Sequence, residues 1–306
     1  MSFFSAIRVA LAALLVNKGR SGLTSLGIVI GISAVIALVS AGDGARYKLD
    51  ERMDSVGKNL ILIRAGARTS QGQIADFQPL TNADGAALRK QLGPLLIGVA
   101  EVQMTHRVAT AGSCSHRTDI VGCTPDIQRV RKWVTTAGRF FTDEDVKSRA
   151  RVCLLGQTAR RKLFPETPDP VGQTLRVDRL RLKVVGVLAE KGRSPLGADQ
   201  DDQIFVPLST LQRELVGVEE VHMILTAPRS ENMTEQIQKD IRRILRDQHR
   251  LNPGQQEPFD VSSVHEMAEL ALIVTRTLQA LIAVVASISL VVGGIGIMNI
   301  MLVSVT

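Results

Sequence analysis

Two long runs without a charged residue lie near the two ends of the chain, and they constrain its fold more than any other feature. Residues 22–42 and 277–306 consist mainly of Leu, Ile, Val and Ala. About 20 helical residues cross the roughly 30 Å of a bilayer's hydrocarbon core, so each run predicts a transmembrane helix. The alternative for the first run is a cleavable signal peptide, whose apolar core is shorter, at roughly 7–15 residues.

The distribution of charge predicts which side of the membrane each part occupies. All 30 acidic residues fall between Asp43 and Glu269, whereas Arg8, Lys18 and Arg20 precede the first span without an acidic partner. Basic residues beside a span stay in the cytoplasm, and long domains cross the membrane largely regardless of their charge. We therefore expect a multi-pass protein of the cell (inner) membrane, with a cytoplasmic N-terminus and a large extracytoplasmic domain.

The first 20 residues carry an amphipathic pattern. Apolar residues recur at helical spacing, with serine and arginine largely off that stripe, which is typical of a helix lying in the membrane interface. The alternative is a simple extension of the first transmembrane helix. The stripe consists of Phe3, Phe4, Ile7, Leu11, Leu14 and Leu15.

The composition argues against a nucleic-acid-binding protein. The chain has a net charge of +7 but only one Trp and one Tyr. Proteins that bind single-stranded nucleic acid combine a clustered basic face with aromatic platforms on which bases stack. We expect membrane lipid, and no nucleic acid, among the partners of this chain.

The region between the spans begins with a strand–helix–strand pattern. Residues 59–64 form a short apolar strand, and Thr81 opens a helix with Asp84 three residues later, close to a capping box. Pro94 ends that helix, and residues 97–108 read as the next strand. The first unit therefore predicts two strands joined by one helix.

A second unit of the same kind lies much later in the chain. Residues 221–226 predict a strand, a helix starts near Pro228 and Ser230, and residues 259–261 predict a second strand. The helix has one apolar face. That face consists of Met233, Ile237, Ile241, Ile244 and Leu245.

The segment between the two units, residues 125–215, predicts a mixed α+β lobe. Thr142 with Asp145, and Ser209 with Gln212, have the spacing of capping boxes. Short helices are therefore expected at both places, and a further helix over residues 158–164. Four short strands are predicted at residues 152–155, 174–177, 182–187 and 204–206, the middle two as a hairpin.

Motifs along nearly the whole chain resemble permeases of the MacB/FtsX-like ABC transporter superfamily. The last span, LVVGGIGIMNIMLVSVT, resembles the second transmembrane helix of such permeases. The other matching segments are NKGRSGLTSLGIVIGISAVIALVSAGDG (17–44), WVTTAGRFFTDEDV (133–146), LLGQTARRKLFP (154–165), DPVGQTLRV (169–177), VVGVLAEKG (184–192) and DQDDQIFVPLSTL (199–211).

The resemblance implies an α+β extracytoplasmic domain flanked by transmembrane α-helices. A porter-like part made of the two strand–helix–strand units would occupy residues 43–124 and 216–265, with the mixed α+β lobe at 125–215 inserted into it. Both lie within an extracytoplasmic domain that would span residues 43–270. The remaining segments would be an interfacial helix (1–20), the first transmembrane helix (21–42) and the second transmembrane helix (271–306).

The resemblance also implies a function and partners. Such permeases work as dimers and couple ATP hydrolysis by a cytoplasmic ABC ATPase, which binds ATP-Mg, to movement of the external domains. This mechanotransmission moves cargo without passing it through a membrane channel. The expected partners are the ATPase subunit, a second copy or a second permease, and a periplasmic adaptor. Relatives export antibiotics, peptides or toxins, extract lipoproteins, or regulate cell-wall enzymes.

The sequence departs from the family pattern at its end. It stops at Thr306, where relatives continue with a basic cytoplasmic segment and two further spans. We therefore expect a C-terminally truncated permease, or one whose second half lies on another chain, and residues 1–306 alone should not support transport. Two alternatives are a membrane-anchored extracytoplasmic sensor or binding module, and a non-functional fragment.

No catalytic or cofactor site is expected in this chain. A phosphate-binding loop of the form GxxxxGK[ST] is missing, as is a GxSxG serine elbow. If residues 115–122 form a strand, Cys114 and Cys123 lie about 30 Å apart, too far for a disulfide or for a zinc site with His116. Cys153 reads as a buried small hydrophobe.

Small residues in the spans are the candidate site residues, as helix-packing positions. Gly27 and Gly31 form a GxxxG pair, which lets two helices approach closely in lipid. A polar side chain at membrane depth is expected to face another helix. The predicted packing residues of the second span are Ser289, Gly293, Gly294, Gly296 and Asn299.

Overall fold

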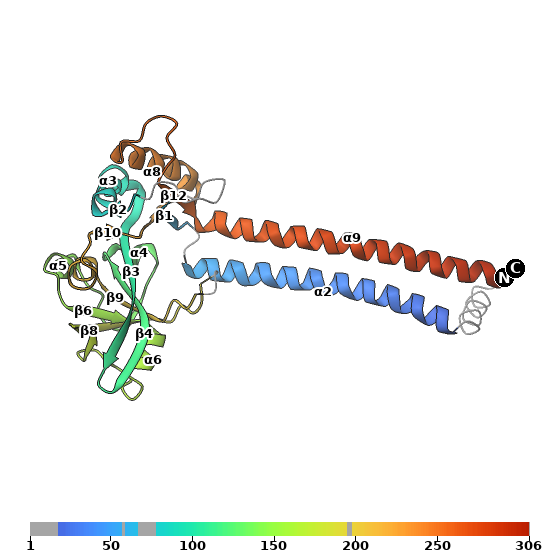
Figure 1. Ribbon diagram of the computed structural model, residues 1–306, viewed down its shortest axis with the longest axis horizontal. Coiled ribbons are helices and arrows are strands. Elements are labelled where there is room, and N and C mark those ends of the chain that lie inside the picture. The colour runs from blue at the N-terminus through green and yellow to red at the C-terminus, as the bar shows by residue number, and fades with distance from the viewer. Residues whose placement is uncertain (1–17, 57–58, 67–77, 195–197, 306) are drawn as a thin grey trace. The chain divides into compact units, whose positions relative to one another are not determined.

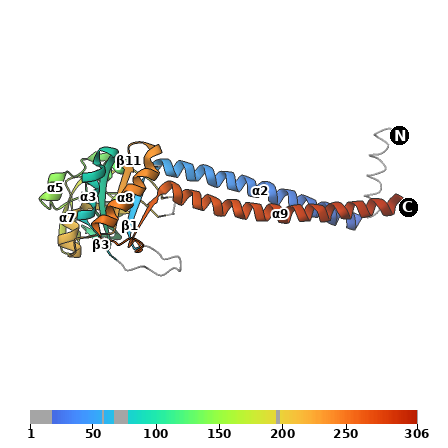
Figure 2. The ribbon, with the colours of Figure 1, turned by 90° about the horizontal axis from the view of Figure 1, so that it is seen from above.

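The computed structural model describes residues 18–56, 59–66, 78–194 and 198–305. It divides into two compact units, one of residues Met1–Asp50 with Ala268–Thr306 and the other of residues Glu51–Met267. Figures 1 and 2 trace the chain through both units. Most of the amphipathic helix expected over residues 1–20 lies outside the described residues.

Two long helices make up the first unit. Helix α2 (Lys18–Val56) and helix α9 (Val264–Val305) each continue beyond the predicted spans, and they lie side by side in both views (Figures 1 and 2). Within the described residues, α9 is long and apolar enough over Val264–Ile295 to cross a membrane, whereas the apolar stretch Val29–Gly44 of α2 is shorter.

Large apolar side chains of this unit face outward. Ile36 is 61% exposed and Val292 is 64% exposed. In water such exposure would be costly, at about 25 cal/mol per Å² of apolar surface. A lipid environment removes that cost, which fits the charge-free runs of the sequence.

The second unit contains one ten-stranded sheet. Its first part has the order β12 (Phe259–Ser263), β1 (Ile61–Ala65), β11 (Met223–Pro228) and β3 (Leu96–Ala111), with every pair antiparallel. This part confirms the strands predicted at residues 59–64, 97–108, 221–226 and 259–261. A separate two-stranded sheet joins β2 (Leu80–Thr81) to β10 (Glu220–Val221).

Two helices cover this part of the sheet with a shared core. Helix α3 (Asn82–Leu92) is followed by a short 3-10 turn (Gly93–Leu95), and α8 (Thr234–Gln248) is preceded by another (Glu231–Met233). Four of the five residues predicted for the apolar face of the second helix are buried here, whereas Met233 lies in the preceding 3-10 turn and is partly buried against this core. The core contains Ile61, Ile63, Leu88, Leu92, Val99, Ile224, Ile237, Ile241, Ile244 and Leu245.

The lobe is a closed ring of six strands. β3 pairs with β4 (Cys114–Cys123), β4 with β9 (Gln203–Pro207), and β9 with β6 (Val152–Leu155). β6 then pairs with β8 (Leu180–Leu188), β8 with β7 (Thr174–Val177), and β7 with β3. The ring encloses a second core, and its members include Ala109, Ile120, Cys153, Leu155, Leu182 and Val206.

The other elements of the lobe lie around this ring. Strand β5 (Thr135–Gly138) adds to β8 at the edge of the sheet. The helices are α4 (Asp126–Val130), α5 (Asp143–Lys147), α6 (Gln157–Leu163) and α7 (Leu208–Thr210), and a π-helical turn spans Leu211–Val216. The strands predicted at residues 152–155, 174–177, 182–187 and 204–206 are confirmed, as is the hairpin pairing.

One predicted capping box is wrong. Ser209 does not cap a helix, because α7 already begins at Leu208 behind Pro207. The Ser209 hydroxyl instead donates a hydrogen bond to the carbonyl oxygen of Val146, and the Gln212 amide donates to the carbonyl oxygen of Glu220 at 3.2 Å. Contacts with distant segments outweigh the local capping pattern at these two residues.

The capping box at Thr142 is confirmed. The Thr142 backbone N–H donates to Asp145 Oδ2 at 2.9 Å, and the Asp145 N–H donates to the Thr142 hydroxyl at 3.4 Å. Arg139 Nη1 also donates to Asp145 Oδ2 at 2.7 Å. The hydrogen bond from Arg139 is the largest cause that lowers the pKa of the Asp145 carboxyl, and bonds from Thr142 lower it further.

The lowered pKa of Asp145 makes part of the domain's stability depend on pH. A carboxyl with a lowered folded pKa stabilises the fold fully above the unfolded value of about 3.9, and this contribution is lost as the pH falls through the folded pKa. Asp145→Asn should cost about 1 kcal/mol at neutral pH, as for a lost helix cap. Below about pH 4 its stability should fall less steeply than that of the wild type.

Urea unfolding of the isolated unit, residues 51–267, at stepped pH measures both effects. Asp143→Asn is the matched control, because Asp143 is exposed and makes no ion pair or side-chain hydrogen bond within the described chain. Identical acid dependence of wild type and Asp145→Asn would contradict the assignment.

Candidate functional site: a polar cleft between the two parts of the domain

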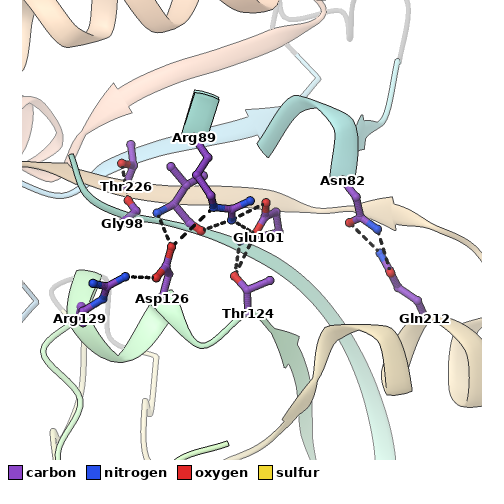
Figure 3. Close-up of polar contacts among 10 residues, drawn as sticks. Asn82, Arg89, Gly98, Glu101, Thr124, Asp126, Arg129, Gln212 and Thr226 are labelled. Atoms are coloured by element: carbon purple, nitrogen blue, oxygen red, sulfur yellow. Dashed lines mark hydrogen bonds and ion pairs between the residues drawn. The ribbon is translucent and has the colours of Figure 1, made fainter. Parts of the chain in front are cut away.

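A cleft of about 500 Å³ opens where α3 of the first part faces the start of the lobe. Figure 3 shows the polar side chains that meet there from α3, β3, α4 and the π-helical turn. The lining side chains are mostly polar or charged. They are Asn82, Arg89, Glu101, Thr124, Asp126, Arg129, Asp143, Val146, Leu208, Ser209 and Gln212.

Glu101 is the buried centre of this network. It lies on β3 and is 3% exposed. Arg89 Nη2 donates to its two carboxylate oxygens at 2.9 and 3.0 Å, and the Thr124 hydroxyl donates to Oε2 at 2.9 Å. A buried charge is tolerated only when it is paired and hydrogen-bonded, and these three bonds meet that requirement.

Asp126 forms the second acidic position. Its Oδ2 accepts the backbone N–H of Val99 at 3.0 Å and lies 3.9 Å from Arg89 Nε, while Arg129 pairs with Oδ1. Asp126 is also the first residue of α4, where a negative charge is favoured by the helix dipole. Arg89 therefore bridges the carboxylate of the strand and the carboxylate of the helix.

Two glycines allow this close approach. A Cβ atom on Gly85 of α3 would overlap the Glu101 carboxylate, and one on Gly98 would lie 3.0 Å from Asp126 Cγ. These positions need glycine for space. The backbone of α3 therefore lies directly against the buried charge of β3.

A pair of side-chain amides joins α3 to the π-helical turn of the lobe. Asn82 Nδ2 donates to Gln212 Oε1 at 3.2 Å, and Gln212 Nε2 donates back to Asn82 Oδ1 at 3.3 Å. Gln212 is 4% exposed. Both amides line the cleft, and this exchange connects segments 130 residues apart in sequence.

The titratable groups among the described residues that line the cleft are carboxylates and arginines. This lining contains no cysteine or histidine that could act as nucleophile or base. The Thr124 hydroxyl is engaged on both sides, because it accepts the Glu101 backbone N–H at 3.2 Å and donates to the same residue's carboxylate. No described group of three or more His, Cys, Asp or Glu residues could hold a metal ion.

The positions of Cys114 and Cys123 agree with the strand considered for residues 115–122. Cys114 and Cys123 are the two ends of β4, and all three cysteines are free. Burial raises the pKa of the Cys153 thiol, which keeps it protonated at neutral pH. His116 instead contacts Asp202 at 2.9 Å.

The helix-packing residues predicted from sequence have mixed surroundings. Gly31 and Gly293 are buried, whereas Gly27 and Gly294 have nothing within 4 Å of a Cβ position. The side-chain surroundings of the other three lie outside the described residues. They are Ser289, Gly296 and Asn299.

A close contact between α2 and α9 is one that the sequence patterns did not predict. Gly42 is buried, and a Cβ there would overlap the side-chain amide of Gln279. A hollow of about 280 Å³ lies beside this contact, lined by Val35, Leu38, Val39, Asp43, Gln279, Ala280 and Ala283. The signal was present in the sequence, because Gln279 is one of only two amide side chains in the charge-free run of residues 277–306, the other being Asn299.

Glu101 and its partners were missed as well. Glu101 is the one carboxylate inside the apolar strand predicted at residues 97–108. A charge in such a run requires a partner from elsewhere, but a single sequence does not tell which arginine supplies it.

Comparison with known proteins identifies the family. Residues 21–244 match the MacB-like periplasmic core domain family. The chain belongs to the MacB-like family of ABC transporter permeases. It is 36% identical over 301 residues to the macrolide export ATP-binding/permease protein MacB of Azoarcus sp. (strain BH72), covering 98% of this chain and 44% of that protein.

A second curated relative matches the MacB-like chain over nearly its whole length. It is 32% identical to the pyoverdine export ATP-binding/permease protein PvdT of Pseudomonas syringae pv. syringae (strain B728a), covering 99% of this chain and 45% of that protein. The chain thus spans about half the length of the curated relatives that it matches.

Solved structures share the fold of the extracytoplasmic domain. The periplasmic region of MacB from Actinobacillus actinomycetemcomitans aligns with a TM-score of 0.61 at 19% identity, covering 73% of this chain and 97% of that one. The extracellular domain of the transporter YknZ aligns at 0.55 and 21% identity, covering 67% and 100%. Because this chain contains a MacB-like periplasmic core domain, it is an inner-membrane protein with an extracytoplasmic α+β domain.

Removing Arg89 should destabilise the domain through Glu101. Arg89→Met leaves a buried carboxylate without its charged partner and should lower the free energy of unfolding by about 3 kcal/mol. Replacing the pair together, Arg89→Met with Glu101→Leu, should recover most of that loss, because apolar residues can substitute for a buried ion pair.

Urea unfolding of residues 51–267 measures this cycle, with the exposed neighbour Lys90→Met as control. If the double variant is as unstable as the sum of the two single variants, Arg89 and Glu101 do not act as a pair.

Gly42 provides a second prediction, for the membrane unit. Gly42→Val should push α2 and α9 apart, since close helix contacts in lipid need small residues. Gly27→Val is the matched control, because it meets open space. Disulfide formation between Val39→Cys and Ala283→Cys, which line the same hollow, should fall several-fold in Gly42→Val only. Equal yields in both backgrounds would refute the contact.

Proposed function

We propose that this chain is a permease (transmembrane) subunit of a MacB-like ABC exporter. A partner ATPase binds and hydrolyses ATP-Mg in the cytoplasm, and the extracytoplasmic domain moves in response. The sequence contains no phosphate-binding loop of its own. The curated relatives are named ATP-binding/permease proteins, which supports an ATPase partner for this chain.

The observation that carries the proposal is the direct junction between β12 and α9. Strand β12 ends at Ser263 and α9 begins at Val264, with no linker between them. The first turn is fixed by a capping box, in which Glu266 accepts the Ser263 backbone N–H at 2.9 Å and Gln238 of α8 donates to Glu266 at 3.0 Å. The Val264 N–H also donates to the Leu60 carbonyl oxygen at 3.0 Å.

Such a junction suits mechanotransmission. A displacement of α9 is transmitted directly to the sheet. No flexible loop absorbs it, because the last residue of β12 is followed at once by the first residue of α9. Neither α2 nor α9 contains a proline that would kink it. The chain works in this scheme as a multi-pass protein with a cytoplasmic N-terminus, paired with a second copy or a second permease and with a periplasmic adaptor.

The names of the relatives indicate a class of cargo and no single compound. Their names refer to export of macrolides and of pyoverdine, so efflux of small molecules is the first candidate. Release of peptides or lipoproteins is the second. The polar cleft suits either role as a moving joint that changes shape while the domain moves.

A linker insertion tests the coupling. Inserting Gly-Ser-Gly between Ser263 and Val264, in the transporter that contains this chain, should abolish efflux of a macrolide from proteoliposomes. ATP hydrolysis by the partner should persist. The same insertion between Pro253 and Gly254, an exposed turn after α8, is the control and should leave efflux intact.

Unchanged efflux after the junction insertion would refute mechanical coupling through α9. The alternative of a membrane-anchored binding module predicts a different result. In that case no ATPase activity changes when the wild-type chain is added to the candidate ATPase.

A further inference from the structure

Four cations share the outer face of one wall of the six-stranded ring. In β7 and β8 side chains alternate, so that Leu175, Val177 and Leu182 are buried inside the ring while their neighbours point outward. Arg176, Arg181 and Lys183 are exposed on these two strands, and Arg117 is exposed on β4.

The strand register places these cations in adjacent rows. Residues directly opposite each other in paired strands share a face. Arg176 lies opposite Arg181 on one side and opposite Thr110 on the other, and Thr110 in turn lies opposite Ser115. Lys183 lies opposite Thr174 in the next row.

Arg117 extends the same face on β4. It lies opposite Val108 of β3, two residues from Thr110, so it projects on the same side as Ser115. With strands about 5 Å apart and same-face residues about 7 Å apart along a strand, all four cations lie within a patch of roughly 20 Å. We define Arg117, Arg176, Arg181 and Lys183 as the basic wall.

The nearest carboxylates along these strands, Asp119 and Asp178, pair with other residues, His106 at 2.8 Å and Arg107 at 3.2 Å. None of the four cations of the basic wall takes part in an ion pair or side-chain hydrogen bond within the described chain. Arginines elsewhere on the domain do pair, for example Arg139 with Asp145 at 2.7 Å and Arg161 with Glu190 at 3.1 Å. Directly opposed like charges, as at Arg176 and Arg181, destabilise a sheet, so this arrangement costs the fold stability.

We propose that the basic wall docks an acidic surface of a partner protein. Three of its four cations are arginines, whose planar fork binds carboxylates at two points and which are enriched at protein interfaces, where lysine is depleted. Their positions are fixed by paired strands, which favours a partner with matching carboxylates. When an acidic partner covers Arg176, the partner's carboxylates attract this side chain and offset the repulsion between Arg176 and Arg181.

An anionic lipid surface fits less well. The outer wall of a closed ring is convex, so a flat bilayer would contact few of the four cations at once. Lipid-binding surfaces also insert apolar side chains, and the described wall offers one exposed large apolar residue, Val108, at 39%. Thr110, Ser115 and Thr174 supply the remaining surface between the cations.

The test measures binding of an acidic probe to the full chain in phosphatidylcholine nanodiscs. The probe is a fluorescent octaglutamate peptide, with octaglutamine as its neutral match, and fluorescence anisotropy gives the dissociation constant. Arg176→Glu with Arg181→Glu should weaken octaglutamate binding at least about tenfold, through loss of complementary charge. Lys90→Glu with Lys239→Glu changes the net charge equally on exposed helix positions of α3 and α8, and should change binding less than about twofold.

A second variant separates docking from folding. Arg176→Gln with Arg181→Gln removes the opposed charges without introducing new ones, so its melting temperature should be equal to or higher than that of the wild type. Its octaglutamate affinity should still fall. Lower stability together with unchanged affinity would overturn the proposal.

Two further outcomes decide against it. If the control variant Lys90→Glu with Lys239→Glu weakens octaglutamate binding equally, the affinity depends only on the net charge of the protein. Vesicles of phosphatidylglycerol test the lipid source: tighter binding of these vesicles than of octaglutamate, lost on Arg176→Glu with Arg181→Glu, would assign the basic wall to a lipid headgroup instead of a protein.

Discussion

The extracytoplasmic domain depends on one strand that belongs to two packing systems. Residues of β3 near Val99 pair with β11 and bury their side chains under α3 and α8. Residues near Ala109 pair with β7 and complete the six-stranded ring around a separate core. Every backbone amide along such a strand needs a partner, so neither part can shift along β3 without breaking pairs in the other.

The polar cleft lies where β3 passes from one system to the other. Glu101 is buried at that point, and its bonds to Arg89 and Thr124 connect α3 with the start of α4. Apolar cores are close-packed and resist gradual deformation, whereas hydrogen-bonded polar groups at a cleft can exchange partners with water. In the proposed mechanism, this polar junction is therefore the place where the two parts move relative to each other.

The sequence patterns predicted the individual strands and helices well, but they did not predict that six strands close into a ring. Alternation located β7 and helical periodicity located α8 to within a few residues, because each buries one face. A short apolar run located β6, which is buried on both faces. Closure of the ring requires β7 to pair with β3, some 65 residues earlier by register, and no local pattern encodes such a pairing. The same holds for Arg89 and Glu101, since the strand shows a lone charge but not its partner.

In the proposed mechanism, the strand order sets how a displacement travels through the described sheet. The helices α2 and α9 lead into β1 and β12, which are neighbours at one end of the sheet order, whereas the basic wall lies on the ring beyond β3. A displacement that entered through α9 would follow the described strand pairs in the order β12, β1, β11 and β3. It would therefore pass Glu101 and the cleft, and a ligand or partner that fixes the cleft would oppose it.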